Sequence, residues 1–337
     1  MLYVTTRNNR DAFTANRVLQ EDRCPDGGFY LPFRPPKFTH EEIDALADKS
    51  FNQNVADILN LFFNIKLTGW DIDFCAGRHS VRLETLRHRI IIAESWHNPD
   101  WDFERTVKSL TFQICKDTRM PTDWIKIAVR IAVLFGIFGE LKKSGVDSAD
   151  VSVLTGDFTQ PISAWYARQW GLPVGNIICS CNENNTLWDL LCHGQMRTDA
   201  VSVPTIIPEA DVTLPAGLER LIYECGGGPE TLCYLDSCRK GRIYCPNDAV
   251  LTRMRKGMYV SVVSSHRTET TIPSVYRTHS YVMSGCTALA YSGLLDYRAK
   301  TGETGYAVVL AEKSPVCDAE LVAKALGIPV ETLRQAI

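Results

Sequence analysis

Short apolar runs alternate with segments of helical periodicity along most of the chain. The runs that read as buried strands are short, mostly apolar and rich in β-branched residues; they cover residues 90–93, 151–154, 176–179 and 306–311. Helical spacing of apolar residues predicts helices near 55–63, 105–115, 161–170, 216–225 and 319–326, and a helix over 124–141 with its apolar residues on one face. Thr39-His-Glu-Glu42 is a capping box that opens another helix, and Thr186 is predicted to cap a further one. Strands that alternate with helices are typical of an α/β protein with a parallel sheet.

The sequence predicts one strand–helix–strand unit most clearly, from residue 151 to residue 179. A strand is followed by the loop 155–160, a helix that begins near Pro161, and a second strand. Backbone N–H groups of such a loop point toward the helix N-terminus, which favours an anion there. Thr155, Gly156, Asp157, Phe158 and Thr159 are therefore candidate anion-binding residues, although the single glycine and the negative side chain by themselves favour an ordinary turn.

Two regions are expected, divided near residue 122. Residues 1–122 form an N-terminal α/β region, and residues 123–337 form the main α/β domain that contains the loop described above. Three consecutive glycines, Gly226–Gly228, are predicted to stop the helix that starts at Ala216. The following segment, residues 226–257, is expected to be an insertion or a flexible excursion.

Charge and hydropathy exclude several classes of function. Lys and Arg total 36 and Asp and Glu total 39, so the formal net charge is −3 and no nucleic-acid partner is expected. Lys126 and Arg130 interrupt the longest apolar stretch, residues 125–138, so no membrane span is expected. Because the first residues contain no apolar signal segment, a cytoplasmic location is expected.

Twelve cysteines are spread along the chain without a Cys-x-x-Cys pair. In the absence of a secretion signal, reduced cysteines are expected rather than disulfides. The densest group lies within residues 225–245, and only Cys233 and Cys238 approach the spacing of a zinc knuckle. Small buried hydrophobic residues are the favoured interpretation, so no metal is expected.

Several ordered motifs resemble the threonine synthase family. Asp26-Gly-Gly-Phe-Tyr-Leu-Pro32 resembles the entry signature of that family, and the segment 94–105 falls where the family has Glu-Leu-Phe-His-Gly-Pro-Thr-x-x-Phe-Lys-Asp. Residues 155–158 and 164–173 resemble its phosphate loop and the helix that follows. Thr287-Ala288 and Ser314-Pro315 resemble its two C-terminal pocket segments, so the likeness is collinear from the first motif to the last.

The resemblance implies a fold-type II pyridoxal-phosphate scaffold, like that of the tryptophan synthase β subunit. In the family, a lysine holds pyridoxal phosphate as a Schiff base, and the cofactor ring serves as the electron sink. The implied cofactor pocket would contain the loop 155–159 and Ser314. The threonine synthase reaction converts phosphohomoserine to threonine.

This chain departs from the family where the chemistry takes place. An ungapped comparison puts Glu104 at the Schiff-base lysine, and a carboxylate cannot form an imine. Asp157 replaces an asparagine and Thr159 replaces a glycine in the phosphate loop, which adds repulsion and removes room for the backbone to approach. His97 and Lys108 are the remaining weak catalytic candidates; Lys108 lies one helical turn beyond Glu104, where a solvated surface lysine is the simpler interpretation.

A whole segment of the family is also missing. The small mobile subdomain with its Ser-Gly-Asp-Thr-Gly loop is largely deleted, and residues 116–121 join the flanking helices directly. Such a deletion exposes apolar surface, so a homo-oligomer or a protein partner is expected to cover it, and the 226–257 segment is a candidate cover within the chain.

Three functional hypotheses follow from these departures. The first is a threonine-synthase-like protein that has lost catalysis, needs no cofactor and acts as a binding or regulatory scaffold. The second is an active pyridoxal-phosphate lyase with a rearranged site, in which Lys108 supplies the amine. The third is a new activity in the same cleft, built on His97, Glu104 and the cysteines, such as Cys286, with a buried Glu104 beside His97 as a general acid and base pair.

Overall fold

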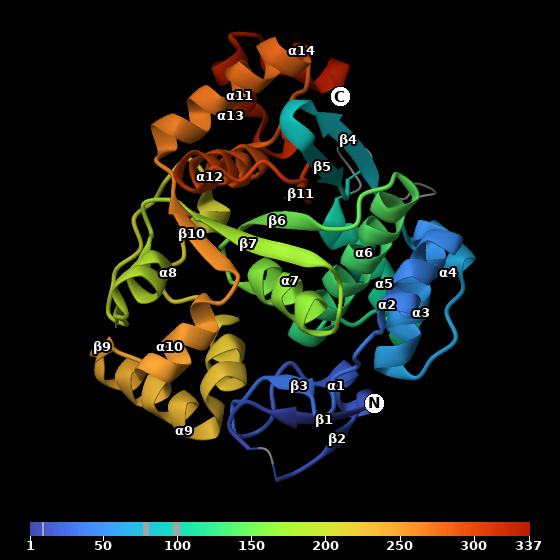
Figure 1. Ribbon diagram of the computed structural model, residues 1–337, viewed down its shortest axis with the longest axis vertical. Helices are drawn as coiled ribbons and strands as arrows, with labels where there is room; N and C mark the ends of the chain where they lie inside the picture. The colour runs from blue at the N-terminus through green and yellow to red at the C-terminus, as the bar shows by residue number, and fades with distance from the viewer. Residues whose placement is uncertain (9, 77–80, 97–101) are drawn as a thin grey trace.

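A six-stranded sheet forms the centre of the molecule (Figure 1). The computed structural model describes residues 1–8, 10–76, 81–96 and 102–337. The strand order is β10-β7-β6-β11-β5-β4, and all neighbouring strands are parallel except β4 and β5. The strands are β4 (Arg82–Leu86), β5 (Ile90–Glu94), β6 (Ala149–Leu154), β7 (Val174–Cys181), β10 (Met258–Val262) and β11 (Ala307–Ala311). The predicted α/β class with a parallel sheet is confirmed.

Helices cover both faces of this sheet. Helices α6 (Asp123–Lys143) and α7 (Thr159–Gln169) lie on one side, and α12 (Gly285–Thr301) packs on the other with α11 (Ser265–His279) and α13 (Ala319–Leu326) behind it. Successive strand residues therefore enter different cores. Ile91 joins the large core that includes α6 and α7, whereas Ile92 joins the core under α12. Burial on both faces explains why these strands read as continuous apolar runs.

The predicted strand–helix–strand unit is present as β6, α7 and β7. The long helix α6 differs from the prediction of one apolar face. Its side chains are buried almost all round, because α3 (Phe51–Phe63) packs against it from outside while α7 packs beside it. Thr186 is the first residue of α8 (Thr186–Trp188) rather than its cap; Asn185 holds the cap position.

A small antiparallel sheet, β2-β1-β3, lies beside the main body (Figure 1). It comprises β1 (Leu2–Thr5), β2 (Phe13–Thr14) and β3 (Tyr30–Pro32), followed in the chain by α2 (His40–Asp44) and α4 (Gly69–Cys75) around α3. The capping box predicted at Thr39 and Glu42 is present. The hydroxyl of Tyr3 donates to the Phe62 carbonyl at 2.8 Å, which fixes this sheet to α3.

The helix predicted to stop at Gly226–Gly228 does not stop there. Helix α9 runs from Leu218 to Lys240 and bends at Gly227, whose φ of 70° and ψ of −171° suit glycine alone. The segment 226–257, expected to be an insertion or a flexible excursion, contains the second half of α9, β9 (Ile243–Tyr244) and α10 (Asp248–Arg255). This segment packs near residues 191–198 through Arg255 and Thr198, so it does not cover the junction at 116–122.

That junction packs against the N-terminal region instead. Helix α5 (Phe103–Cys115) ends at Lys116, and α6 begins seven residues later, so no subdomain separates them. The Thr122 hydroxyl donates to the Val18 carbonyl at 3.1 Å, on helix α1 (Ala15–Gln20). Residues 1–122 also contribute β4 and β5 to the main sheet, so the expected boundary at residue 122 runs within one sheet.

The remaining elements are short. They are the 3₁₀ helices Ala45–Asp48, Arg87–Arg89, Pro208–Ala210 and Pro315–Asp318, the π-helix Asp189–His193, β8 (Met196–Arg197), which pairs with β9, and α14 (Val330–Ala336). Within the described parts of the chain, every helix is too short or too polar to cross a bilayer.

Candidate functional site

A cavity of about 340 Å³ opens where β6 and β11 end. The residues that follow these two neighbouring parallel strands, Thr155 and Glu312, form part of its wall, together with the first turn of α5, the middle of α6 and the 3₁₀ helix 208–210. The carboxyl ends of parallel strands are the usual place for a site in an α/β sheet. The position of this cavity makes it the candidate functional site.

The predicted anion-binding loop lines this cavity, but an acid of the chain occupies its donors. One oxygen of Asp157, Oδ1, accepts hydrogen bonds from the Thr159 backbone N–H at 2.9 Å and from the Thr159 hydroxyl at 2.6 Å. These donors lie at the N-terminus of α7, where the helix dipole favours a negative group. Asp157 is therefore the anion that this helix terminus already holds.

Arg130 of α6 reaches the same place from the opposite wall. Its Nε and NH2 atoms donate to the two carboxylate oxygens of Glu312 at 2.7 and 2.9 Å, and NH1 donates to the Thr159 hydroxyl at 3.0 Å. The guanidinium also stacks over the Phe103 ring, 4.7 Å from its centroid. Both ion-pair partners are only 12% exposed, and the fork of hydrogen bonds satisfies both charges.

A second ion pair, between Lys313 and Glu209, lines the cavity beside the first. Burial alone would lower the pKa of Lys313, but the hydrogen bond and charge of Glu209 raise it overall. The Lys313 amine is thus held protonated at neutral pH, which makes it a poor nucleophile. Cys286 lies close to this pair, and burial together with the charges of Glu209 and Asp318 raises the pKa of its thiol well above the ordinary value.

Glu104 stands at the start of α5 and lines both this cavity and a smaller adjoining pocket of about 150 Å³. Its side chain is exposed, so the idea of a buried general acid at this position is wrong. Lys108 is also exposed and lines only the smaller pocket. The single lysine among the described residues that line the larger cavity is Lys313.

Some of the other predicted site residues line the cavity, and some do not. Thr155, Gly156, Asp157 and Thr159 line the cavity, as expected for one loop. Phe158 does not, because its side chain is fully buried in the core, and Ser314 is fully buried and caps the 3₁₀ helix 315–318 through its hydroxyl. His97 lies outside the described residues. Among the residues that the structure does describe, no group of three metal-binding side chains occurs.

The predicted site lacks the cavity residues that lie far from it in the chain, Arg130 and Glu209 among them. Arg130 carried a signal, since it interrupts an otherwise apolar helix, and a buried charge inside such a helix needs a partner. Glu209 gave no comparable signal, because residues 200–215 contain almost no regular structure. Only the fold brings the loop at Glu209 beside the loop at Lys313.

Comparison of the fold with solved structures defines its class, which is a threonine-synthase fold. A PLP-bound threonine synthase from Brucella melitensis superposes with a TM-score of 0.86 at 19% identity, covering 97% of this chain and 92% of that one. Threonine synthase from yeast superposes with a TM-score of 0.84 at 15% identity, covering 97% and 90%.

The sequence resembles the same family. The family profile described as "Threonine synthase N terminus" matches residues 2–76. Threonine synthase of Pseudomonas aeruginosa is 27% identical over 205 residues, which are 60% of this chain and 43% of that protein. Threonine synthase-like 1 of Mus musculus is 34% identical over 76 residues, which are 22% of this chain and 10% of that protein. The matched segments thus span less than half of the length of these relatives, and the chain is threonine-synthase-like in sequence as well as in fold.

Proposed function

We propose that this chain is a non-catalytic, threonine-synthase-like binding scaffold that holds no pyridoxal phosphate. The observation that carries the proposal is the position of Glu104 in the cavity wall, where the resemblance expects the lysine that forms the imine. A carboxylate cannot condense with an aldehyde. The one lysine among the described cavity residues, Lys313, is protonated by its contact with Glu209 and is therefore a poor substitute.

The charges of the cavity are also unfavourable for binding a phosphate group. Two of its four carboxylates, Glu209 and Glu312, are paired with Lys313 and Arg130, which leaves Glu104 and Asp157 as excess negative charge. The Asp157 carboxylate accepts the Thr159 donors that a phosphate would need. A doubly charged phosphate placed there would meet a like charge at close range, which is strongly unfavourable in a partly buried site.

What remains is a preformed polar cavity on a rigid scaffold. The bidentate Arg130–Glu312 pair and the Glu209–Lys313 pair hold four side chains in fixed positions and give the cavity a rigid wall, against which a small polar ligand or a protein segment would bind. The exposed Glu104 at the mouth adds an acceptor for a positively charged group. A cytoplasmic location, the identity of a partner and a role in threonine biosynthesis stay predictions.

Covalent binding of pyridoxal phosphate is the decisive test of this proposal. Purified protein would be incubated with pyridoxal phosphate, reduced with borohydride and digested, and each lysine would be examined by mass spectrometry. We expect no visible imine absorption and no preferred adduct on Lys108 or Lys313. The Glu104→Lys variant serves as the comparison, because it restores an amine at the family position, and Lys108→Arg removes the alternative amine on α5 without changing charge.

Two outcomes would overturn the proposal. A stoichiometric, reducible adduct on Lys108 or Lys313 of the wild-type protein would favour an active lyase with a rearranged site. Turnover of phosphohomoserine that is lost in Lys108→Arg would do the same. Absence of an adduct in the wild type, with or without one in Glu104→Lys, supports a chain that does not bind the cofactor covalently.

A further inference from the structure

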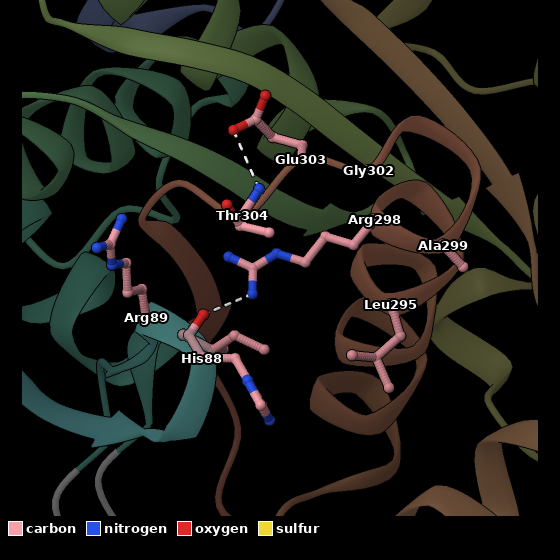
Figure 2. A pocket seen from close by; sticks show the side chains of 9 residues that line it. His88, Arg89, Leu295, Arg298, Ala299, Gly302, Glu303 and Thr304 are labelled. Atoms are coloured by element: carbon pink, nitrogen blue, oxygen red, sulfur yellow. Dashed lines mark hydrogen bonds between the residues drawn. The ribbon is translucent and has the colours of Figure 1, made fainter.

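A second cavity, of about 580 Å³, lies at the other end of β11 from the candidate site (Figure 2). Its wall is formed by the turn between β4 and β5, by the last turns of α12 and by the loop that enters β11. The candidate site follows the carboxyl end of β11, whereas this cavity precedes its amino end, so the two are separated by the length of the strand. Nothing proposed above uses it.

Basic side chains dominate this cavity. Arg89 and Arg298 line it with His88, against a single acid, Glu303. Glu303 is already engaged, since its Oε1 accepts from the backbone N–H groups of Thr304 at 3.1 Å and Gly305 at 3.0 Å. Arg89 contacts the ring of Tyr306 and, among the described residues, neither arginine forms an ion pair. Two arginines against one lining carboxylate leave the cavity with an excess of positive charge, although Asp150 and Glu303 interact with Arg298 electrostatically.

Arg298 is fixed in place by the backbone around the cavity. NH1 donates to the His88 carbonyl at 2.6 Å and NH2 donates to the Gly305 carbonyl, while the buried Nε atom has no hydrogen-bond partner among the described residues (Figure 2). Burial lowers the pKa of Arg298, partly offset by the charge of the buried Asp150. Such a guanidinium is preorganised, because its position does not depend on a bound molecule.

The turn that carries the other two basic residues is conformationally unfavourable. His88 and Arg89 have φ values of 61° and 58°, in the left-handed region where glycine or asparagine is preferred in a hairpin turn. Two consecutive side-chain-bearing residues in this region contradict the local preference. Residues that break such a rule without local gain are expected at functional positions.

We propose that this cavity binds a small organic anion, with a phosphate or carboxylate group near Arg89 and Arg298 and an apolar body against Leu295 and Ala299. A guanidinium fork matches the paired oxygens of either anion. Leu295 and Ala299 come from one face of α12 and supply the apolar side, as Figure 2 shows. The combination of a charged end and an apolar wall is typical of a small-molecule site.

Calorimetry on the full chain tests this proposal. It measures the binding of phenyl phosphate, benzoate, phenol and inorganic phosphate. We expect saturable binding of phenyl phosphate or benzoate and much weaker binding of phenol and of inorganic phosphate; which of the two aromatic anions binds more tightly identifies the anionic group. Arg89→Gly is expected to weaken binding at least tenfold while its melting temperature stays equal to or above that of the wild type, because glycine accepts the positive φ. Arg87→Ala, in the same turn but outside the cavity wall, is expected to bind as the wild type does.

A second variant tests whether a loss of affinity comes from a change in folding. Arg89→Asn keeps a residue that tolerates the left-handed conformation and is expected to lose affinity to the same extent as Arg89→Gly. The proposal fails if neither aromatic anion binds the wild type, if phenol binds as tightly as they do, or if Arg89→Gly and Arg89→Asn retain wild-type affinity.

Discussion

At the scale of single residues, the candidate site is defined by how its charges are paired. The sequence places Glu104 where the resemblance expects a lysine, and this observation needs no structure. The pairing of Arg130 with Glu312, 182 positions further along the chain, needs the fold. Arg130 and Glu312 satisfy one another so completely that they behave as part of the scaffold rather than as free recognition groups.

We therefore expect Arg130→Met to destabilise the protein by on the order of 3 kcal/mol, because it leaves the Glu312 carboxylate unpaired in a partly buried site. The double variant Arg130→Met with Glu312→Leu should recover most of that loss, since it removes both charges. Unfolding in urea, followed by circular dichroism, gives the two free energies.

The exposed pair Lys240–Asp236 supplies the matched control. Both side chains are about half exposed, so Lys240→Met should cost less than about 1 kcal/mol. Equal losses for Arg130→Met and Lys240→Met would contradict a structural role for the pair in the cavity.

At the scale of elements, most helices and strands follow from local pattern, and the exceptions have physical reasons. The capping box at Thr39, the apolar strand at 90–94 and the unit 151–181 lie where the sequence predicts them, because each depends on contacts within a few residues. Helix α9 is the exception. A run of glycines predicts a stop, but Tyr234 and Thr231 beyond the bend are buried by the rest of the fold, which holds the chain in a helix on both sides of Gly227.

Two adjacent glycines of helix α9 are expected to respond in opposite ways to substitution by alanine: one change destabilises the protein and the other does not. Gly227→Ala is expected to cost about 1–3 kcal/mol, since its backbone conformation is essentially restricted to glycine. Gly228→Ala should be neutral or stabilising by up to about 1 kcal/mol, because no atom lies within 4 Å of the added Cβ and alanine is the better helix former.

Thermal melts of the two variants measure this difference directly. If Gly228→Ala proved as destabilising as Gly227→Ala, poor tolerance of any side chain at the bend, rather than the positive φ, would be the cause.

At the scale of the whole molecule, the direct connection of α5 to α6 leaves apolar side chains exposed. Trp70 and Phe74 of α4 are 84% and 70% exposed and lie one helical turn apart, and Met120 of the junction is 70% exposed. Helix α4 packs against α5, and the junction begins at the end of α5. The other end of the junction is joined to α1 by the hydrogen bond from Thr122 to Val18.

The expected homo-oligomer is tested at this surface. Exposed aromatic residues on one helix face suit a two-fold contact between identical chains, in which the same patch meets its copy. We expect light scattering to give a dimer mass for the wild type and a monomer mass for Trp70→Ser with Phe74→Ser. The variant Val201→Ser, at an equally exposed apolar residue outside α4, should leave the mass unchanged.

A wild-type protein that is monomeric at all accessible concentrations would contradict self-association. In that case the expectation of a different protein partner would remain, and capture experiments with the wild type and the double variant would test it.

The sequence by itself determined the α/β class, most element positions and the resemblance to threonine synthases; the placement of Glu104 at the position of the family's lysine stays a prediction. These features depend on residue identity and on spacing over a few positions, which the linear order records. The tertiary structure alone decided that Asp157 fills its own helix terminus, that Arg130 and Lys313 are paired, and that His88, Arg89 and Arg298 surround a second cavity. Those contacts join residues up to 210 positions apart, and only packing of the helices on the sheet fixes which distant charges meet.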